Sequence, residues 1–348
     1  MSHMSSFPLT SPAVLQATAA SHLAQGTLER ARGFARALIE NEQLDTGEDV
    51  WQHADAVAAI LARIGGSEEM QAAGYLVYAC PHLNKPEEVI AKAFGENLAQ
   101  LALQTNQLLH LQRLSRAAAS SAQLIDDPKL QTENVRKMLL AFSRDLRVVM
   151  LRLASRMQTL RHYAATKQPV PVALARESLN VFAPLANRLG IWQIKWELED
   201  LSFRFLEPDT YKQIARLLDE KRVEREQYME ALCQRLSQAL AAQGIAAQVS
   251  GRPKHIYSIV KKMRGKSLPF DRVFDIRALR VVVPEVADCY QALSWVHEQF
   301  TPIPEEFDDY IARPKANGYQ SLHTVVRDTD GRPIEIQIRT QAMHDHAE

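Results

Sequence analysis

A dense group of basic residues opens the last third of the chain. The segment 251–263 reads GRPKHIYSIVKKM and contains five basic or potentially basic side chains: Arg252, Lys254, His255, Lys261 and Lys262. Glycine and proline indicate a turn, and apolar residues at helical spacing predict a helix over 256–263. Cations beside the free N–H groups of a helix start are typical of a polyphosphate site. A solvated basic helix face is the alternative, and this segment alone favours it.

A carboxylate lies at the entrance to the next apolar segment. Asp275 precedes residues 278–283, which read ALRVVV and predict a strand because they are rich in β-branched side chains. A carboxylate at a strand end is a common ligand of a Mg²⁺ ion that bridges substrate phosphates. A turn aspartate that caps its own backbone is an equally good interpretation.

An alternating segment lies near the end of the chain. In residues 334–340, which read IEIQIRT, the isoleucines fall on one face of a strand and Glu335, Gln337 and Arg339 on the other. The polar face could be a solvated exterior or the floor of a polar site. The second interpretation gains weight because Asp275 and the basic segment belong to the same small domain.

The segment 313–323 combines an aromatic ring with cations and an amide. It reads RPKANGYQSLH, and four of its side chains surround a glycine turn ahead of a predicted strand: Lys315, Asn317, Tyr319 and His323. Such a set suits a stacked nucleobase that carries phosphates, and an ordinary hairpin loop is the alternative. Just upstream lies an acidic stretch that by itself is typical of a solvated loop, with Glu306, Asp308 and Asp309.

The chain falls into two regions of different composition, and these contain the helices and strands that must position the site residues. From about residue 13 to 242 the chain is rich in strong helix formers, with apolar residues at helical spacing and breakers near 165–172. After Gly244 the pattern predicts helices over 256–263 and 286–300 and strands over 245–249, 278–283, 320–327 and 333–339. We therefore expect an all-helical part followed by a compact α/β part with a mixed sheet.

Bulk composition sets wider limits. The 348 residues include 41 basic and 41 acidic side chains, so a nucleotide site must come from local clustering of charge. The three cysteines are sparse and odd in number, which predicts a reduced, cytoplasmic protein without a disulfide framework. No apolar run approaches the length of a membrane span, and no secretory signal is expected.

Four segments in this order closely resemble the RelA/SpoT family of (p)ppGpp synthetases: GRPKHIYSIVKKM, FDIRALRVVV, RPKANGYQSLHT and EIQIRT. The resemblance is strong over 244–348 and looser over the helical part. It implies a helical HD-like domain (5–165), connecting helices (166–242) and a nucleotidyltransferase-like mixed-sheet α/β synthetase domain (243–348). Because family members continue past EIQIRT, we expect the last domain to be truncated. The implied reaction transfers pyrophosphate from ATP to the 3′-hydroxyl of GDP or GTP.

The resemblance also implies roles for the site residues. The residues that would hold ATP, here called the donor cluster, are Arg252, Lys254, Ser258, Lys261, Lys262 and Arg277. Those that would hold GDP or GTP, here called the acceptor group, are Lys315, Asn317, Tyr319 and His323, with the tyrosine stacked on guanine. Asp275 and Glu335 would bind Mg²⁺, Glu335 would also activate the 3′-hydroxyl, and Gln337 would support it.

Two departures from bifunctional family members point to one subtype. The loop Glu306-Phe-Asp-Asp309 matches the acidic type of monofunctional RelA. Of the metal ligands of the HD hydrolase, only His53 is matched, because the His-Asp pair is expected at Ala79-Cys80 and Ser155 replaces the later aspartate. A hydroxyl is a poor substitute for a carboxylate on a metal ion. We therefore expect an inactive hydrolase domain.

A second hypothesis remains open at this stage. A guanine-nucleotide-binding regulatory module without turnover would share the donor cluster and Tyr319 but would not need both Asp275 and Glu335. The joint presence of the two carboxylates favours the enzyme. The ribosome and uncharged tRNA are expected as partners only of the missing C-terminal half, and no membrane partner is expected.

Overall fold

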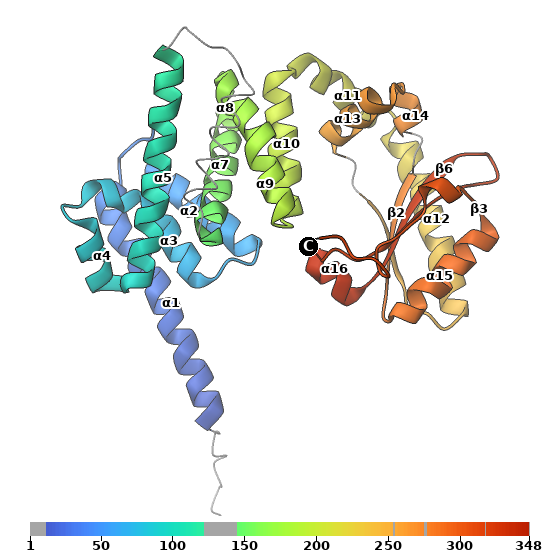
Figure 1. Ribbon diagram of the computed structural model, residues 1–348, viewed down its shortest axis with the longest axis horizontal. Helices are drawn as coiled ribbons and strands as arrows, with labels where there is room; N and C mark the ends of the chain where they lie inside the picture. Colours follow the sequence, from blue (N-terminus) through green and yellow to red (C-terminus); the bar gives the residue numbers. More distant parts are fainter. Residues whose placement is uncertain (1–11, 122–144, 253–254, 275–276, 317, 348) are drawn as a thin grey trace, which may run out of the picture. The chain divides into compact units, whose positions relative to one another are not determined.

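The structure is a computed structural model that describes residues 12–121, 145–252, 255–274, 277–316 and 318–347 (Figure 1). The chain divides into two compact units, Met1–Pro169 and Val170–Glu348, and each is described by itself. Most of the helices expected to connect the domains, 166–242, belong to the second unit. Within the described ranges, none of the helices combines the length and apolar character that a membrane crossing needs.

The described part of the first unit is a bundle of helices. They are α1 (Pro12–Ile39), α2 (Val50–Arg63), α3 (Glu68–Ala79), α4 (Pro86–Phe94), α5 (Glu96–Ser121) and α7 (Leu146–Thr166), with a 3₁₀ turn at Cys80–His82. Helix α3 packs against α1, α2, α5 and α7. Asp49 and Ser67 begin α2 and α3 as N-caps, because each side chain accepts a hydrogen bond from a backbone N–H of the first turn.

The second unit begins with helices. They are α8 (Val172–Glu177), a π-helical turn (Ser178–Phe182), α9 (Ala183–Arg188), α10 (Trp192–Leu206), α11 (Pro208–Glu220) and α12 (Arg222–Ala242). Helix α10 packs on α9, α11 and the later helix α13 (Ile256–Lys266). A small apolar cluster joins α10, α11, α13 and α14 (Phe270–Phe274) through Phe203, Ile214, Ile259 and Phe270.

A mixed sheet forms the rest of this unit. Its strands are β1 (Gln248–Gly251), β2 (Arg277–Val283), β3 (Thr301–Pro302), β4 (Asp308–Asp309), β5 (Leu322–Arg327) and β6 (Pro333–Thr340). The order is β1-β2-β6-β5-β3, with β4 beside β5. Strands β2 and β6 are parallel, and the other pairs are antiparallel, so the mixed sheet expected from the sequence is confirmed.

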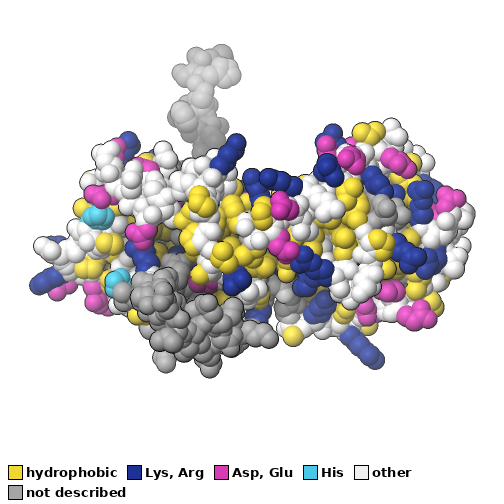
Figure 2. All heavy atoms as spheres, turned by 90° about the horizontal axis from the view of Figure 1, so that it is seen from above, with side chains coloured by type: hydrophobic (Ala, Val, Ile, Leu, Met, Phe, Trp, Pro, Cys, Tyr) yellow, Lys and Arg dark blue, Asp and Glu magenta, His cyan; other side chains and the backbone are white. Residues whose placement is uncertain are grey.

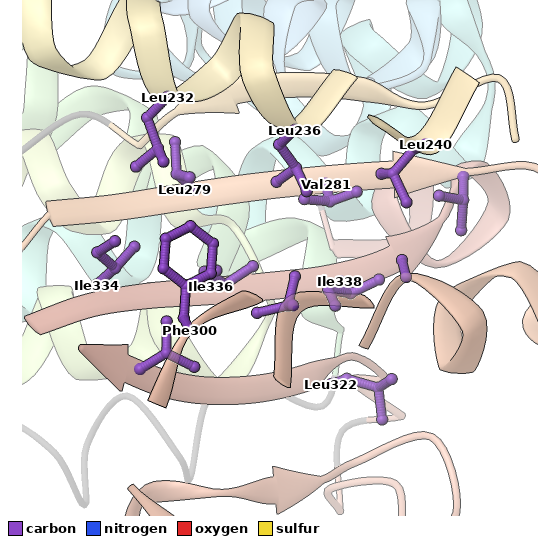
Figure 3. Packing of buried hydrophobic residues seen from close by; sticks show 14 of the residues in the cluster. Leu232, Leu236, Leu240, Leu279, Val281, Phe300, Leu322, Ile334, Ile336 and Ile338 are labelled. Carbon is purple, nitrogen blue, oxygen red and sulfur yellow. The ribbon is translucent and has the colours of Figure 1, made fainter. Parts of the chain in front are cut away.

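The core of the sheet lies on one face, under α12 and α15 (Val286–Gln299). Leucines of α12 follow one helical stripe and pack on the strands in Figure 3: Leu232, Leu236 and Leu240. The alternating segment of β6 supplies Ile334, Ile336 and Ile338 to the same core, each at most 2% exposed. Burying these side chains is the main force that orients the strand, and it turns Glu335, Gln337 and Arg339 to the opposite face.

Most predicted elements of this unit are confirmed with small shifts. The helices expected over 256–263 and 286–300 are present, as are the strands over 278–283, 320–327 and 333–339. The strand expected over 245–249 begins only at Gln248, because Ile245 closes the end of α12 with a bond from its N–H to the Leu240 carbonyl and is buried there.

On the face shown in Figure 2, basic and acidic side chains are interspersed, as the balanced charges lead one to expect.

Candidate active site

The face of the sheet opposite the core gathers polar side chains from three strands. The pairing of β2 with β6 sets Arg280 beside Gln337, and the pairing of β5 with β6 sets His323 on the other side of Gln337. Since side chains at paired positions share a face, Glu335, Gln337 and Arg280 belong to one surface. The second of the two interpretations of the alternating strand, the floor of a polar site, is the one that this arrangement supports.

Arg277 does not join this face. It is one residue out of phase with Ala278 and Arg280, it is 3% exposed, and its guanidinium lies 5.0 Å from the ring centroid of Tyr228 on α12. Its side chain therefore lies on the other face of the sheet from Arg280, and it is not among the residues that line the pocket described below. Arg280 stands on the polar face instead and was missed, although strand alternation in ALRVVV could have identified it.

A small pocket adjoins this face. Its lining comes from α10, the loop after β1, α13, α14 and β2: Trp196, Arg252, His255, Ser258, Ile259, Lys262, Val273, Ala278 and Arg280. Three members of the donor cluster, Arg252, Ser258 and Lys262, thus line one concavity. Lys261 is exposed on α13 and does not contribute to the lining.

The pocket and the strand face are joined by an ion pair. Lys262 Nζ lies 3.0 Å from Oε1 of Glu335, and the two side chains are 44% and 27% exposed. A cation of the donor cluster and the expected catalytic carboxylate are therefore direct neighbours. This contact brings together two segments that the sequence could only place in the same domain.

The start of α13 differs from the expectation. The sequence predicted that the N–H groups at this helix start would be free for a phosphate, but Oδ1 of Asp200 on α10 accepts a hydrogen bond from the Tyr257 N–H at 3.0 Å. Burial raises the pKa of Asp200, against the lowering effect of the N–H groups of Tyr257 and Ile256. A carboxylate from another helix thus caps α13 where an anion would otherwise bind.

The acceptor group forms an aromatic cluster beside the polar face. The hydroxyl of Tyr319 lies 2.8 Å from Nε2 of His323, and the side-chain nitrogen of Gln337 lies 3.3 Å from the same atom. Lys315 Nζ lies 4.6 Å and 5.4 Å from the ring centroids of Tyr310 and Tyr319. A base that stacks in this cluster would therefore meet both a ring and a cation.

The protonation state of His323 and the backbone at Gly318 both suit this cluster. Burial, followed by the charges of Arg252 and Lys315, lowers the pKa of His323 to about 4, so at pH 7 the neutral ring can accept a hydrogen bond from the Tyr319 hydroxyl. Gly318 has a φ of +81°, and a Cβ there would lie 3.1 Å from Nε2 of His346 on α16 (Gln341–Ala347). Both the left-handed backbone and the close approach favour glycine at this turn.

The acidic loop is ordered by its own hydrogen bonds. Oδ1 of Asp309 accepts from the N–H groups of Ile311 and Ala312, and Oδ2 accepts from the Tyr290 hydroxyl at 2.8 Å. Asp308 pairs with His323 between β4 and β5, which sets the loop against the acceptor group. Glu306 is exposed at the end of the 3₁₀ turn Pro304–Glu306.

Three predicted site residues lie outside the described residues: Lys254, Asp275 and Asn317. Their assignments therefore stay predictions. Elsewhere, within the described ranges, no three His, Cys, Asp or Glu side chains lie close enough to hold a metal ion. A metal that is shared between a protein carboxylate and substrate phosphates needs no such cluster, because Mg²⁺ commonly takes only one or two protein ligands.

The first unit contains a buried polar network around His53. Its Nε2 lies 2.8 Å from the Tyr78 hydroxyl and 3.0 Å from Oγ of Ser155, and its Nδ1 bonds Glu48. Gln158 donates to the other oxygen of Glu48 at 2.8 Å. Burial would raise the pKa of Glu48, but the bonds and charge of His53, with Gln158 and His162, outweigh it and lower the pKa.

The network shows which residue of α3 contacts His53. The residue that faces His53 and Ser155 from α3 is Tyr78, whereas Ala79 is a fully buried core residue and Cys80 donates its thiol to the Leu76 carbonyl at 3.3 Å. Neither residue of the expected pair Ala79-Cys80 is bonded to His53, and its assignment as the former His-Asp position stays a prediction.

Two protein families match the chain. Residues 31–192 match the HD domain family, and residues 251–348 match the family described as the region found in RelA / SpoT proteins. Among solved structures, the small alarmone synthetase 1 of Bacillus subtilis bound to its product pppGpp is 31% identical, over 38% of this chain and 75% of that chain, with a TM-score of 0.31.

Several curated relatives align with most of this chain. It is 47% identical over 261 residues to the GTP pyrophosphokinase of Photobacterium angustum and 46% identical over 262 residues to that of Escherichia coli K12. Each alignment covers 75% of this chain and 34% of the relative. A probable guanosine-3′,5′-bis(diphosphate) 3′-pyrophosphohydrolase of Synechocystis is 43% identical over 320 residues, which are 92% of this chain and 41% of that protein. The chain thus spans well under half of the length of these relatives.

Proposed function

Since the chain belongs to the RelA/SpoT family and carries an HD domain followed by a RelA/SpoT region, we propose that it synthesises (p)ppGpp. In this reaction the 3′-hydroxyl of GDP or GTP attacks the β-phosphorus of ATP, and AMP leaves. The observation that carries the proposal is the contact between Lys262 and Glu335, which joins a basic pocket to a carboxylate on the polar sheet face.

The pocket residues have a clear part in this reaction. Arg252, Lys262 and Arg280 would neutralise the triphosphate, and Ser258 would donate to it from the same wall. Phosphoryl and pyrophosphoryl transfers depend mainly on positioning and charge neutralisation, which a rigid basic pocket supplies. Glu335 would take the proton of the 3′-hydroxyl, since it is the carboxylate that directly adjoins the basic pocket, 3.0 Å from Lys262 Nζ.

The acceptor nucleotide fits the second half of the site. Tyr319 offers a ring for the guanine, with Lys315 close enough to meet its phosphates. Gln337 and His323 lie between this ring and Glu335, so the ribose would be held near the carboxylate. Asn317 would add contacts to the same nucleotide.

A Mg²⁺ ion is part of this proposal. Glu335 is a half-buried carboxylate beside the donor pocket, and with Asp275 it would form the oxygen ligand pair that Mg²⁺ shares with phosphates. Bound there, the ion would neutralise charge on the triphosphate. The ion pair with Lys262 shows that the carboxylate already faces a positive charge in this position.

We also assign the chain to the monofunctional, RelA-like type with an inactive hydrolase. The support is the network around His53, in which the imidazole is bonded to the hydroxyls of Tyr78 and Ser155, and a hydroxyl is a poor metal ligand compared with a carboxylate. The acidic loop at Glu306, Asp308 and Asp309 agrees with the same type. The ribosome and uncharged tRNA remain proposed partners, and the cytoplasm the proposed compartment.

The competing function is a nucleotide-binding regulatory module without turnover. One experiment separates the two: the chain is incubated with Mg²⁺, ATP and GDP, and the products are resolved by anion-exchange chromatography. Synthesis predicts equal amounts of AMP and guanosine tetraphosphate. Binding of both nucleotides without AMP release would overturn the proposed activity in favour of the module.

A further inference from the structure

A helix outside the predicted synthetase domain contributes to the donor pocket. Trp196 of α10 is part of the pocket lining, although the sequence analysis began this domain at residue 243. Its ring stacks on His255, with centroids 4.5 Å apart and an interplanar angle of 19°. His255 directly precedes α13 and lines the same pocket as Arg252, so the stack fixes the residue that leads into this helix.

The same helix also holds the start of α13. Asp200, one turn after Trp196, accepts the Tyr257 N–H at 3.0 Å. The neighbouring residue Ser258 and, one turn further on, Lys262 both line the pocket. The contact with Asp200 therefore fixes the first turn of α13, which carries Ser258, and Lys262 lies one turn further along the same helix.

These contacts are two points of one longer interface. Further along α10, the ring of Phe203 lies 5.6 Å from that of Tyr257, and Phe203 is buried with Ile259 in an apolar cluster. Just beyond the end of α10, Glu207 forms a bidentate pair with Arg264 at 2.7 and 2.9 Å. The apolar contacts of Phe203 and the ion pair of Glu207 would hold α10 and α13 together without Trp196 or Asp200. These last two residues are therefore not needed to keep the helices packed.

We propose that Trp196 and Asp200 are positioning residues for the pyrophosphate donor: they fix His255 and the first turn of α13 so that the pocket accepts a nucleoside triphosphate. This inference rests on the proposed function for the identity of the donor. It makes α10 part of the synthetase site rather than a connection to it. The acceptor group lies on other elements. We therefore expect the affinity for GDP or GTP to depend little on Trp196 and Asp200.

The test uses the full chain and two pairs of variants. Asp200→Ala removes the cap, whereas Asp200→Asn keeps an oxygen that caps a helix as well as aspartate does. Trp196→Ala removes the stack, whereas Trp196→Phe keeps an aromatic ring over His255. The control is Glu207→Gln, which loses the ion pair at the far end of the same interface. For each variant one measures KM for ATP, KM for GDP and the thermal unfolding midpoint.

The expected result is a split between the substrates. Asp200→Ala should raise KM for ATP by about 2- to 30-fold, the factor that corresponds to the loss of a helix cap, and we expect a loss in the same range for Trp196→Ala. KM for GDP should change less than twofold, the asparagine and phenylalanine variants should recover most of the loss, and Glu207→Gln should leave both values unchanged. Equal losses for both substrates together with a lower unfolding midpoint would show a merely structural role and overturn the inference, as would unchanged KM values.

Failure of the proposed function remains distinguishable from failure of this inference. If the unmodified chain makes no product, binding of α,β-methylene-ATP, whose α–β bridge cannot be cleaved, is measured by calorimetry with Mg²⁺ present. A 2- to 30-fold weaker binding by the alanine variants, with recovery by the conservative ones, would support the positioning role even without turnover. Equal affinity in all variants would overturn it.

Discussion

The ammonium nitrogen of Lys262 on α13 lies 3.0 Å from a carboxylate oxygen of Glu335 on β6, across 73 positions of sequence. Both partners have a proposed role with a substrate. Because both side chains are partly exposed, the pair itself is worth at most about 1 kcal/mol of stability.

The first prediction concerns Glu335→Gln. The amide keeps the size and the bond to Lys262 but cannot take a proton, so synthesis should fall about 10²- to 10⁴-fold. Folding should survive, because the residue lies on the polar face and not in the core. Product formation and the unfolding midpoint are measured on the same preparation.

A Mg²⁺ titration of this variant separates two roles of the carboxylate. Extra metal can rescue a weakened ligand but cannot replace a lost base. Partial recovery at high Mg²⁺ would assign Glu335 to the metal, and a uniform loss would assign it to proton transfer. Near-normal synthesis by the folded variant at ordinary Mg²⁺ would remove Glu335 from the site.

The second prediction concerns Tyr319. Tyr319→Ala should weaken GDP binding by about 1–3 kcal/mol, the range for stacking of a base on an aromatic ring, and should leave ATP binding unchanged. Tyr319→Phe is the matched control, because it keeps the ring and loses only the bond to His323. If the two variants lose affinity equally, the hydroxyl and not the ring is the important group, and the stacking assignment fails.

The third prediction is a pH dependence of stability through His323. Its pKa is lowered to about 4 in the folded chain, whereas an unfolded histidine titrates near 6.5. Between these values the unfolded chain binds more protons, so the free energy of unfolding falls as the pH falls from about 6.5 to about 4. Above pH 6.5 neither state is protonated, and the effect is absent.

Urea unfolding of the chain and of His323→Gln at pH 7 and pH 5 measures this contribution. Between these pH values the unmodified chain should lose about 1–2 kcal/mol more stability than the variant, since one pKa unit is worth about 1.4 kcal/mol. The comparison cancels the contributions of His255 and His297, whose pKa values are also lowered by burial. Parallel losses in the two proteins would contradict the assignment to His323.

The fourth prediction concerns the helical unit. With Tyr78 and Ser155 bonded to His53, the chain should release no pyrophosphate from ppGpp when Mn²⁺ is present. Mn²⁺ and a chelator should both leave the unfolding midpoint unchanged, because a metal that binds only the folded state would raise it. Metal-dependent release of pyrophosphate would show that the hydrolase is active.

Local sequence patterns predicted the strands and helices of the second unit well. The alternating sequence of β6 predicted which side chains enter the core. Side chains of a strand point to opposite faces in turn, so burial of Ile334, Ile336 and Ile338 allows only one orientation of the strand. The same logic, applied to β2, would have separated Arg277 from Arg280. The resemblance of four motifs identified the family, since each motif carries its own residue types in a fixed order.

Contacts between distant segments were decided only by the tertiary structure. The stack of Trp196 on His255, the cap of Asp200 on α13 and the ion pair of Lys262 with Glu335 join residues 57 or more positions apart. No local period encodes such pairs, because helical or strand spacing sets the face of an element but not the element against which that face packs. For the same reason the residue beside His53 proved to be Tyr78: the rotation of α3 about its axis is fixed by its packing against α1, α2, α5 and α7.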